Sequence, residues 1–500
     1  MTFIRKALPA IVLVAIAFAA SAADLVILHT NDTHSQIDPT DKGFGGVQRR
    51  KVFVDSVRAA CPNVLLVDAG DAVQGTLFFT LYGGEVEMKV MNGLGYDLQI
   101  LGNHDFDNGV DSMAHNVALS DAQWISTNYK FADPKVQRLF APYKIYEMDG
   151  RKIAFIGLNV EPKGLIAEGN YDGVGYLDPV DAADATGWWL KNRLGADYVV
   201  ALTHLGYDNQ TNPSDVELVK STKNVDIVLG GHSHTVIRPG SGDEWVKNAV
   251  GKPVLVTQNG KSGQYITEVT VNLDSLQLPP RYRQILLDSS YDRSYSDSLE
   301  AGIAPYRTGV DSLMSKVIGK SAVDLPADSP GLLNFVSDFC YDLGCRLAGR
   351  PVDLALMNSG SLRRGLGKGK ITQGQIISMQ PFTNHVLVME IKGGDLIDAM
   401  NVYASRDGDG VSDQVRATFD PISHKMVDLT VGGKPVDPDK TYLLATIDYM
   451  AHGGDYMAPL TRGKIIATSP DIVYNDLIAY IKQLRHSINP SSASRFVPTR

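Results

Sequence analysis

The sequence predicts two α/β domains in series, the first with a layered sheet and the second of α/β or α+β type. The chain has 500 residues, which is more than one hydrophobic core usually organises. Over residues 24–275, short runs of β-branched and aliphatic residues alternate with helix-like stretches, which is typical of a sheet covered on both faces. A second mixture of helical and strand patterns occupies residues 321–486. The composition, 44% hydrophobic and 21% charged, is that of an ordinary globular protein.

The chain begins with a segment that is typical of a bacterial secretory signal peptide, over residues 1–22. Arg5 and Lys6 form a basic start, an apolar run follows over residues 8–20, and Ala20-Ser21-Ala22 is a small-residue cleavage pattern. The alternative is a membrane anchor, but the apolar run is shorter than the roughly 20 residues that a spanning helix needs. We therefore expect cleavage, a periplasmic or secreted protein, and no stable membrane insertion.

The first domain is expected to contain short strands that are buried on both faces. The clearest apolar runs occupy residues 25–28, 64–67, 98–101, 153–158, 198–202, 226–229 and 254–257, with helix-like stretches at 46–58 and 181–194. Residues 276–320 lack strong strand signals, contain Pro279-Pro280 and continue as a polar, helix-like stretch. This part of the chain is therefore predicted to be a linker with a helix.

The second domain is predicted to open with a helix over residues 332–347. Strand patterns follow at residues 354–357, 386–391, 426–431 and 442–446. The last residues, 487–500, are rich in serine and proline, so we expect them to form a loose tail.

Charge and cysteine content argue against two classes of protein, namely those that bind nucleic-acid polymers and those whose fold depends on disulfides. The formal net charge is −9 and the sequence has no basic stripe, which argues against a nucleic-acid polymer as partner. A small phosphorylated substrate is compatible with an acidic chain, because metal ions and a few arginines set the local field. The three cysteines, Cys61, Cys340 and Cys345, are too few for a disulfide scaffold, and free thiols are favoured over a bridge between Cys340 and Cys345.

Metal-binding residue types follow five of the predicted strands directly. The segments are Asn31-Asp32-Thr33-His34, Gly70-Asp71, Gly102-Asn103-His104-Asp105-Phe106-Asp107, Thr203-His204 and Gly230-Gly231-His232-Ser233-His234. Ligands in open α/β sheets collect beyond the carboxyl ends of the strands, so these segments are expected to converge. Imidazole and carboxylate together favour Zn, Mn, Fe or similar divalent ions over Mg or Ca. The set is too large for one ion, and two ions that share a bridging carboxylate suit phosphoryl hydrolysis.

These motifs, in this order, resemble those of the calcineurin-like metallophosphoesterases, and their flanking residues are similar to the bacterial 5′-nucleotidase branch. The resemblance implies an α/β/β/α metallophosphoesterase domain, a 5′-nucleotidase C-terminal substrate-binding domain and a cofactor of two divalent metal ions. It also implies two metal sites that share Asp71 as a bridge. The first site is Asp32, His34, Asp71 and His234, and the second is Asp71, Asn103, His204 and His232. Several bacterial members have Gln where His234 stands, and His234 keeps a ligand at that position.

The same resemblance implies a catalytic pair. His104 and Asp107 match the family's pair, in which a carboxylate orients an imidazole that stabilises the transition state or assists the leaving group. Asp105 lies between them and is expected to cap the turn.

The second domain resembles the family's substrate-recognition domain less strictly. The matching motifs are Met357-Asn358-Ser359-Gly360-Ser361-Leu362-Arg363, Gln380-Pro381-Phe382, Ile447-Asp448-Tyr449 and Gly453-Gly454-Asp455. The resemblance implies that Phe382 and Tyr449 sandwich a base and that Arg363 meets phosphate. It further implies that Asn358 and Asp455 hold polar groups of the ribose or base. Two features depart from the family: residues 325–330 lack a substrate-facing arginine, for which Arg364 is the candidate replacement, and serines stand in place of glycines at 359 and 361.

The expected function is hydrolysis of a phosphate ester, with a nucleoside 5′-monophosphate as substrate. A UDP-sugar hydrolase and a 2′,3′-cyclic-nucleotide phosphodiesterase are alternatives, because they share the metal chemistry. A metal-dependent nucleotide-binding protein without turnover is the non-enzymatic alternative. His104 and Asp107 together argue against that alternative, because a protein that only binds nucleotides needs no residues that assist a leaving group.

Overall fold

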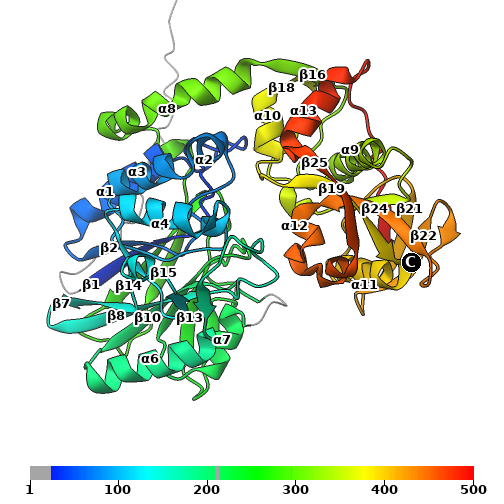
Figure 1. Cartoon of the computed structure of the whole chain (residues 1–500). Coiled ribbons are helices and arrows are strands. Elements are labelled where there is room, and N and C mark those ends of the chain that lie inside the picture. Colours follow the sequence, from blue (N-terminus) through cyan, green and yellow to red (C-terminus); the bar gives the residue numbers. More distant parts are fainter. Residues whose placement is uncertain (1–23, 209–212, 294, 500) are drawn as a thin grey trace, which may run out of the picture.

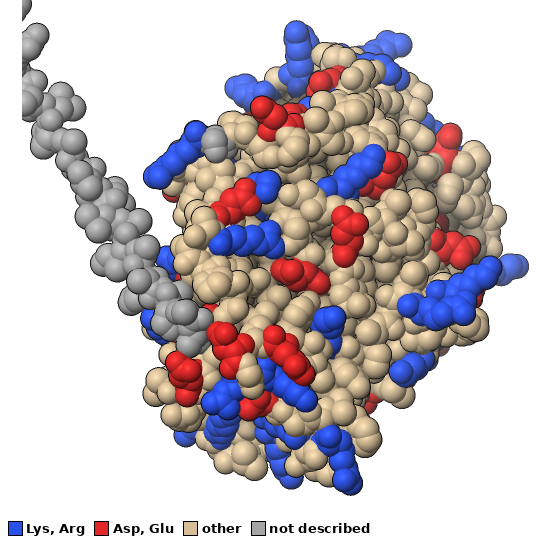
Figure 2. All heavy atoms as spheres, turned by 90° about the vertical axis from the view of Figure 1, so that its left-hand side faces the viewer, with Lys and Arg blue, Asp and Glu red and all other residues tan. Residues whose placement is uncertain are grey.

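A computed structural model describes residues 24–208, 213–293 and 295–499, and it shows two domains that lie side by side (Figure 1). The predicted signal peptide, residues 1–22, lies outside the described residues. Within the described part of the chain, no helix has the length and apolarity needed to cross a membrane. On the face shown in Figure 2, basic and acidic side chains are interspersed.

The N-terminal domain contains two mixed sheets that pack face to face. In spatial order, the first sheet is β15 (Arg281–Leu286), β14 (Tyr265–Asn272), β1 (Asp24–Thr30), β2 (Val64–Asp68), β3 (Leu98–Gln99), β4 (Gln123–Ile125) and β6 (Phe140–Ala141). The second sheet is β12 (Trp245–Lys247), β13 (Pro253–Thr257), β11 (Ile227–Gly230), β10 (Tyr198–His204), β8 (Arg151–Asn159) and β7 (Tyr143–Met148). A separate pair is formed by β5 (Tyr129–Phe131) and β9 (Val174–Tyr176).

Burial on both faces explains why the central strands have continuous apolar runs. In β1, Leu25 and Ile27 point into the core between the two sheets, whereas Val26 and Leu28 point into the core under the helices. Helices cover the outer face of the first sheet, namely α1 (Val47–Ala60), α2 (Leu77–Tyr82) and α3 (Glu85–Leu94), with α4 (Gly109–Leu119) packed beside α3. The second sheet is covered by α6 (Pro179–Arg193) and α7 (Asp215–Ser221), and the short α5 (Pro134–Gln137) packs on β5. The predicted α/β/β/α layering is confirmed.

The C-terminal domain is of α/β type and has one main core. Its five-stranded sheet has the order β20 (Gly410–Val411), β17 (Leu354–Met357), β24 (Thr441–Ile447), β19 (His385–Lys392) and β25 (Lys464–Ile472). A four-stranded sheet has the order β23 (Lys434–Pro435), β22 (Lys425–Val431), β21 (Val415–Asp420) and β26 (Phe496–Pro498), and β16 (Val317–Ser321) pairs with β18 (Gly369–Thr372). The helices are α9 (Pro330–Ala348), α10 (Gln373–Met379), α11 (Gly393–Ala404), α12 (Asp448–Ala451) and α13 (Val473–Gln483).

The segment predicted as a linker over residues 276–320 contains the expected helix but is not only a connection. Its first part forms β15, which adds an edge strand to the first sheet by antiparallel pairing with β14. Its helix, α8 (Asp297–Ser315), bridges the domains (Figure 1): Leu299 and Ile303 pack on the N-terminal domain, and Leu313 packs on the C-terminal core. One helix therefore packs against the core of each domain.

The residues after 486, predicted to be loose, are fixed to the C-terminal domain. β26 pairs in parallel with β21, and Phe496 packs against Phe419. Arg495 Nη2 lies 2.7 Å from Asp338 Oδ2 on α9. This anchoring is not predicted from the sequence, because it depends on contacts with residues far away in the chain and leaves no local pattern. All three cysteines lie in the described residues and are free thiols.

Candidate active site

The five ligand-bearing segments meet at one edge of the N-terminal domain. β1, β2 and β3 run parallel to one another, as do β10 and β11, so the loops at their carboxyl ends emerge on the same side. The two sheets present these loops to each other, and the predicted ligand residues converge between them. The structure thus brings together the metal-binding residue types that the sequence places after five separate strands.

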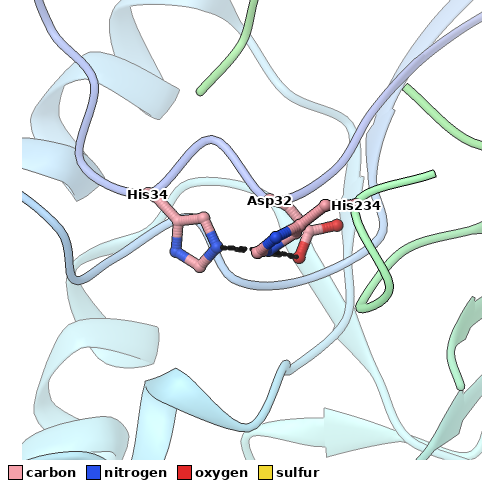
Figure 3. Close-up of side chains that lie close together, drawn as sticks. All are labelled: Asp32, His34 and His234. Atoms are coloured by element: carbon pink, nitrogen blue, oxygen red, sulfur yellow. Dashed lines mark hydrogen bonds and ion pairs between the residues drawn. The ribbon is translucent and has the colours of Figure 1, made fainter. Parts of the chain in front are cut away.

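One cluster contains Asp32, His34 and His234, whose candidate ligand atoms all lie within 4.8 Å of one another. His34 Nε2 is 2.9 Å from His234 Nε2, and His234 Nε2 is 3.4 Å from Asp32 Oδ1 (Figure 3). The side chains point toward a common centre from two loops that are 200 residues apart in sequence.

A second cluster contains Asp32, Asp71 and His204. His204 Nε2 lies 3.2 Å from Asp71 Oδ2 and 4.0 Å from Asp32 Oδ1, so the two clusters share Asp32 in this geometry. His204 Nδ1 donates to the carbonyl oxygen of Ala69 at 2.7 Å. This hydrogen bond fixes the orientation of the ring and directs Nε2 toward the carboxylates, as is usual for metal-binding histidines.

Asn103 and His232 complete the predicted ligand set. Their side chains contact each other, with Asn103 Oδ1 2.9 Å from His232 Nδ1, and both line the same cavity as Asp71 and His234. The backbone N–H of His232 donates to Asp32 Oδ2 at 2.9 Å, which joins the loop after β11 to the loop after β1.

The ligand loops are held in a backbone conformation that is unusual for residues other than glycine. The φ angles that lie in the left-handed region belong to Asp32 (49°), His34 (47°), Asp71 (56°), His232 (81°) and His234 (55°). Such strain clusters at functional sites, where the surrounding structure enforces it. Gly102 shows how closely the loops approach, because a Cβ there would lie 2.1 Å from Asp71 Oδ1.

The electrostatics of the clusters fit divalent cations. Asp32 Oδ1 and His204 Nε2 are buried and have no hydrogen-bond partner among the described residues. Burial lowers the pKa of His204, but the charge of Asp71 outweighs burial, and the pKa of His204 is raised to about 10. The pKa of His232 is lowered to about 3 by burial and by His204. Buried carboxylate oxygens and imidazole nitrogens that face one another, as Asp32 Oδ1 and His204 Nε2 do, are the arrangement that a metal ion satisfies.

His104 and Asp107 lie beside the clusters as a hydrogen-bonded pair. His104 Nδ1 is 3.1 and 3.0 Å from the two carboxylate oxygens of Asp107. The backbone N–H of His104 donates to Asp71 Oδ1 at 2.9 Å, which fixes this pair relative to the ligand loop. Asp105 Oδ2 accepts from the N–H of Gly102 at 2.7 Å, the turn-capping contact that the sequence predicted for it.

A cavity of about 260 Å³ lies between the two domains and includes residues from both. The five predicted substrate residues line it, namely Asn358, Arg363, Phe382, Tyr449 and Asp455. Arg363 reaches across to the N-terminal domain, where its Nη2 lies 2.7 Å from His104 Nε2, and it stacks over Phe382 at 5.2 Å. The cavity therefore joins the metal-ligand loops, the His104–Asp107 pair and the predicted substrate residues in one space.

Other contacts within the cavity fix the predicted substrate residues. Asn358 Nδ2 donates to Asp455 Oδ2 at 2.5 Å. Tyr449 donates from its hydroxyl to the carbonyl oxygen of Leu165, at 2.8 Å. This bond ties the predicted base-stacking residue of the C-terminal domain to a loop of the N-terminal domain.

Sequence reasoning missed the N-terminal loop that forms one wall of the cavity. Its lining residues are Leu165, Ile166, Ala167 and Asn170. The loop has neither strand periodicity nor metal-binding residue types, so nothing in the sequence distinguished it.

Arg364, the candidate replacement for the absent arginine, is not among the residues that line the cavity. Its Nη2 donates to Gln36 Oε1 at 2.6 Å.

Comparisons with known proteins agree with this architecture. Residues 25–236 match the family model for calcineurin-like phosphoesterases, and residues 317–462 match that for the 5′-nucleotidase C-terminal domain. The chain is 28% identical to a 5′-nucleotidase of Vibrio cholerae serotype O1, over 95% of this chain and 92% of that protein. It is 26% identical to the trifunctional nucleotide phosphoesterase protein YfkN of Bacillus subtilis, over 95% of this chain but only 35% of that protein.

A solved structure with the same domain arrangement is the 5′-nucleotidase precursor of Thermus thermophilus. The two chains superpose with a TM-score of 0.84 and 28% sequence identity, over 95% of this chain and 99% of that chain. Both domains and their order along the chain are therefore matched by these comparisons. The chain is a metal-dependent phosphoester hydrolase that has a calcineurin-like phosphoesterase domain followed by a 5′-nucleotidase C-terminal domain.

Proposed function

We propose that this protein is an exported, dinuclear-metal hydrolase that releases phosphate from nucleoside 5′-monophosphates. The observation that carries the proposal is the contact of Arg363 with His104 inside a cavity that both domains line. A cavity with metal-ligand loops at one end and stacking residues at the other suits a substrate that has a phosphate at one end and a base at the other.

Two ions would be held by two ligand sets that share Asp71, a member of the second cluster, although Asp32 is the residue common to both clusters in the present geometry. The first set is Asp32, His34, Asp71 and His234, and the second is Asp71, Asn103, His204 and His232, with Zn, Mn or similar ions suited to these donors. Such ions supply charge stabilisation at the phosphate oxygens and a nucleophilic water at neutral pH.

The protein's own residues orient the ester and handle the leaving group. Asp107 accepts from His104 Nδ1–H and thereby fixes the imidazole with Nε2 directed toward the cavity. There His104, protonated at Nε2 once Arg363 has turned to the phosphate, stabilises charge on the phosphate or donates that proton to the departing ribose oxygen. Arg363 exchanges its contact with His104 for one to a phosphate oxygen, because a guanidinium binds oxyanions more strongly than a neutral imidazole.

The C-terminal residues hold the nucleoside. Phe382 and Tyr449 offer aromatic faces to the base, and both line the cavity. Asp455 and Asn358 provide hydrogen-bonding groups for ribose hydroxyls or base edges, and their mutual hydrogen bond fixes their orientation. Binding is thus divided between a phosphate end and a nucleoside end.

The test is phosphate release by the purified mature protein with Mn or Zn, across AMP, UMP, ADP, UDP-glucose, 2′,3′-cyclic AMP and p-nitrophenyl phosphate. We expect the monophosphates to have the highest kcat/KM. Preference for UDP-glucose or for 2′,3′-cyclic AMP would support the same metal-dependent hydrolysis but would identify a nucleotide sugar or a cyclic nucleotide as the substrate. Metal-loaded protein that binds AMP but releases no phosphate from any of these compounds would support the non-enzymatic nucleotide-binding alternative.

Export is proposed from the basic, apolar and small-residue pattern of residues 1–22. Expression of the full chain in a bacterium, followed by fractionation and N-terminal sequencing, tests it. The expected mature N-terminus is Ala23 in the periplasmic or secreted fraction. An intact N-terminus in the cytoplasmic or membrane fraction would contradict it.

A further inference from the structure

The loop that carries Asp455 is held by Arg406, a residue outside all the motifs considered above. Arg406 follows α11, and its Nη2 donates to the carbonyl oxygen of Asp455 at 2.8 Å. Its Nη1 lies 3.6 Å from Asp455 Oδ2. One guanidinium therefore contacts both the backbone and the carboxylate of a residue that lines the cavity.

The backbone at this point requires support. Asp455 and Tyr456 both have φ in the left-handed region, at 56° and 60°. This conformation is uncommon for residues other than glycine, and contacts with neighbouring groups help to hold it. The N–H of Asp455 donates to the hydroxyl of Tyr449 at 3.1 Å, and the carbonyl oxygen of Asp455 accepts from Arg406. Arg406 thus provides one of the contacts that keep this strained loop in place.

The same arginine lies next to the loop that carries Asn358. Arg406 Nη1 is 3.9 Å from Asp409 Oδ2. Asp409 Oδ1 in turn accepts from the N–H of Ser359 at 2.6 Å and from that of Gly410 at 2.9 Å. Asp409 therefore fixes the backbone directly after Asn358, and Arg406 lies between the two carboxylates that define the Asn358 and Asp455 loops.

Charge explains why this position needs a cation. Asp409 is buried, and its pKa is raised to about 6, mainly by burial; Arg406 opposes this shift and Asp455 adds to it. Arg406 Nη1 lies near both carboxylates, so removing the guanidinium would leave the charges of Asp409 and Asp455 without the cation between them. The two loops would then lose the relative position that the Asn358–Asp455 hydrogen bond requires.

We propose that Arg406 is a positioning residue for the nucleoside end of the cavity, where it fixes the Asn358–Asp455 pair. Arg406 is not among the described residues that line the cavity, so it acts through Asn358 and Asp455. The inference rests on the proposed function, because it assigns the nucleoside end of the same site.

The test compares Arg406→Ala and Arg406→Lys with Arg462→Ala. Arg462 is a matched control in the same domain, because it forms two ion pairs, with Asp395 and Asp398, and its side chain is 56% exposed. Adenosine binding, measured by calorimetry on metal-loaded protein, reports the nucleoside end without phosphate or turnover. Hydrolysis of p-nitrophenyl phosphate reports the metal site without ribose or a nucleobase.

We expect Arg406→Ala to weaken adenosine binding about tenfold or more, the usual effect of losing a hydrogen bond from a charged group. Its kcat/KM for p-nitrophenyl phosphate should stay within about twofold of wild type, as for a site remote from the chemistry. Arg406→Lys should be intermediate, because it keeps the charge between the carboxylates but loses the planar fork. Arg462→Ala should match wild type in both assays.

Unchanged adenosine affinity in Arg406→Ala would overturn the inference, and so would an equal loss of p-nitrophenyl phosphate hydrolysis, which would indicate a general structural role. Absence of adenosine binding to the wild type would overturn it as well. If the wild type binds adenosine but releases no phosphate from AMP, the proposed function fails, whereas the effect of Arg406→Ala on adenosine binding still decides the role of Arg406.

Discussion

Arg363 Nη2 lies 2.7 Å from His104 Nε2, so a side chain of the C-terminal domain contacts the imidazole that the N-terminal domain holds beside its metal-ligand loops. Since Arg363 donates, His104 Nε2 accepts, and Nδ1 carries the proton that is shared with Asp107. Bound phosphate would compete with His104 for the guanidinium. The contact therefore links the proposed phosphate-binding arginine of one domain to the proposed catalytic imidazole of the other.

Replacing Arg363 by Ala should weaken phosphate binding. We expect KM for AMP and the inhibition constant of inorganic phosphate to rise roughly 10- to 100-fold, because a hydrogen bond between two charged groups is lost. Arg364→Ala is the matched control, since Arg364 contacts Gln36 and is not among the cavity-lining residues. A larger effect of Arg364→Ala than of Arg363→Ala would show that Arg364 is the phosphate-binding arginine.

Replacing His104 by Ala should lower kcat while the metals stay bound. Loss of a positioned acid–base group typically costs about 100- to 10,000-fold in rate. Asp107→Asn should have a smaller effect in the same direction, because the imidazole stays but loses its orienting carboxylate. Elemental analysis of each variant checks metal content. A fall of less than about tenfold with full metal content would contradict the assigned role.

Replacing Asp71 by Asn should reduce both metal content and activity, because Asp71 is the proposed shared ligand. Chelation should likewise abolish wild-type activity, and Mn or Zn should restore it. Asp105→Asn is the control from the neighbouring loop, since Asp105 accepts a turn-capping hydrogen bond that an amide oxygen can also accept. Metal content measured by elemental analysis should fall only in Asp71→Asn. Two ions per chain retained in that variant would exclude a bridging role.

The burial of Glu87 predicts that the free energy of unfolding depends on pH. Burial raises its pKa to about 7, so the folded chain keeps the proton at pH values where the unfolded chain has lost it. The free energy of unfolding therefore falls as pH rises from about 4.5 to about 7, by roughly 3 kcal/mol for this group. Glu87→Gln removes the ionisation, and its Tm should exceed that of wild type at pH 8 but not at pH 4.

The control for Glu87 is Glu147→Gln, because the Glu147 side chain is 72% exposed and pairs with Lys152 only at 3.8 Å. Thermal unfolding of both variants and the wild type, at pH 4 and pH 8 with matched metal loading, measures the difference. Equal pH dependence in Glu87→Gln and wild type would show that Glu87 ionises in the folded protein without cost.

Truncation after residue 486 should destabilise the C-terminal domain. It removes β26 from the edge of β21 and leaves Asp338 without the guanidinium of Arg495. We expect Tm to fall by several degrees, on the order of 2–4 °C for each 1 kcal/mol lost in a domain of this size. Arg495→Ala should reproduce part of the loss. An unchanged Tm on truncation would support the loose tail that the sequence predicted.

The sequence by itself determined the strands of the N-terminal domain and the chemistry at their ends. A strand such as β1 is buried on both faces, so its apolar run is continuous and visible without any knowledge of its neighbours. The metal-binding residue types that follow these runs converge because the carboxyl ends of parallel strands meet at one edge. Both signals are local in sequence, and the structure brings the predicted residues together.

Only the tertiary structure decided how the two domains share the site. β15, the bridging role of α8 and the fixed C-terminal residues all depend on contacts between segments far apart in the chain. The same holds for the Arg363–His104 contact, which spans 259 positions, and for the support of Asp455 by Arg406. Such contacts leave no periodic trace in the sequence, because a single polar side chain at the end of a loop acquires its partner only when the domains pack.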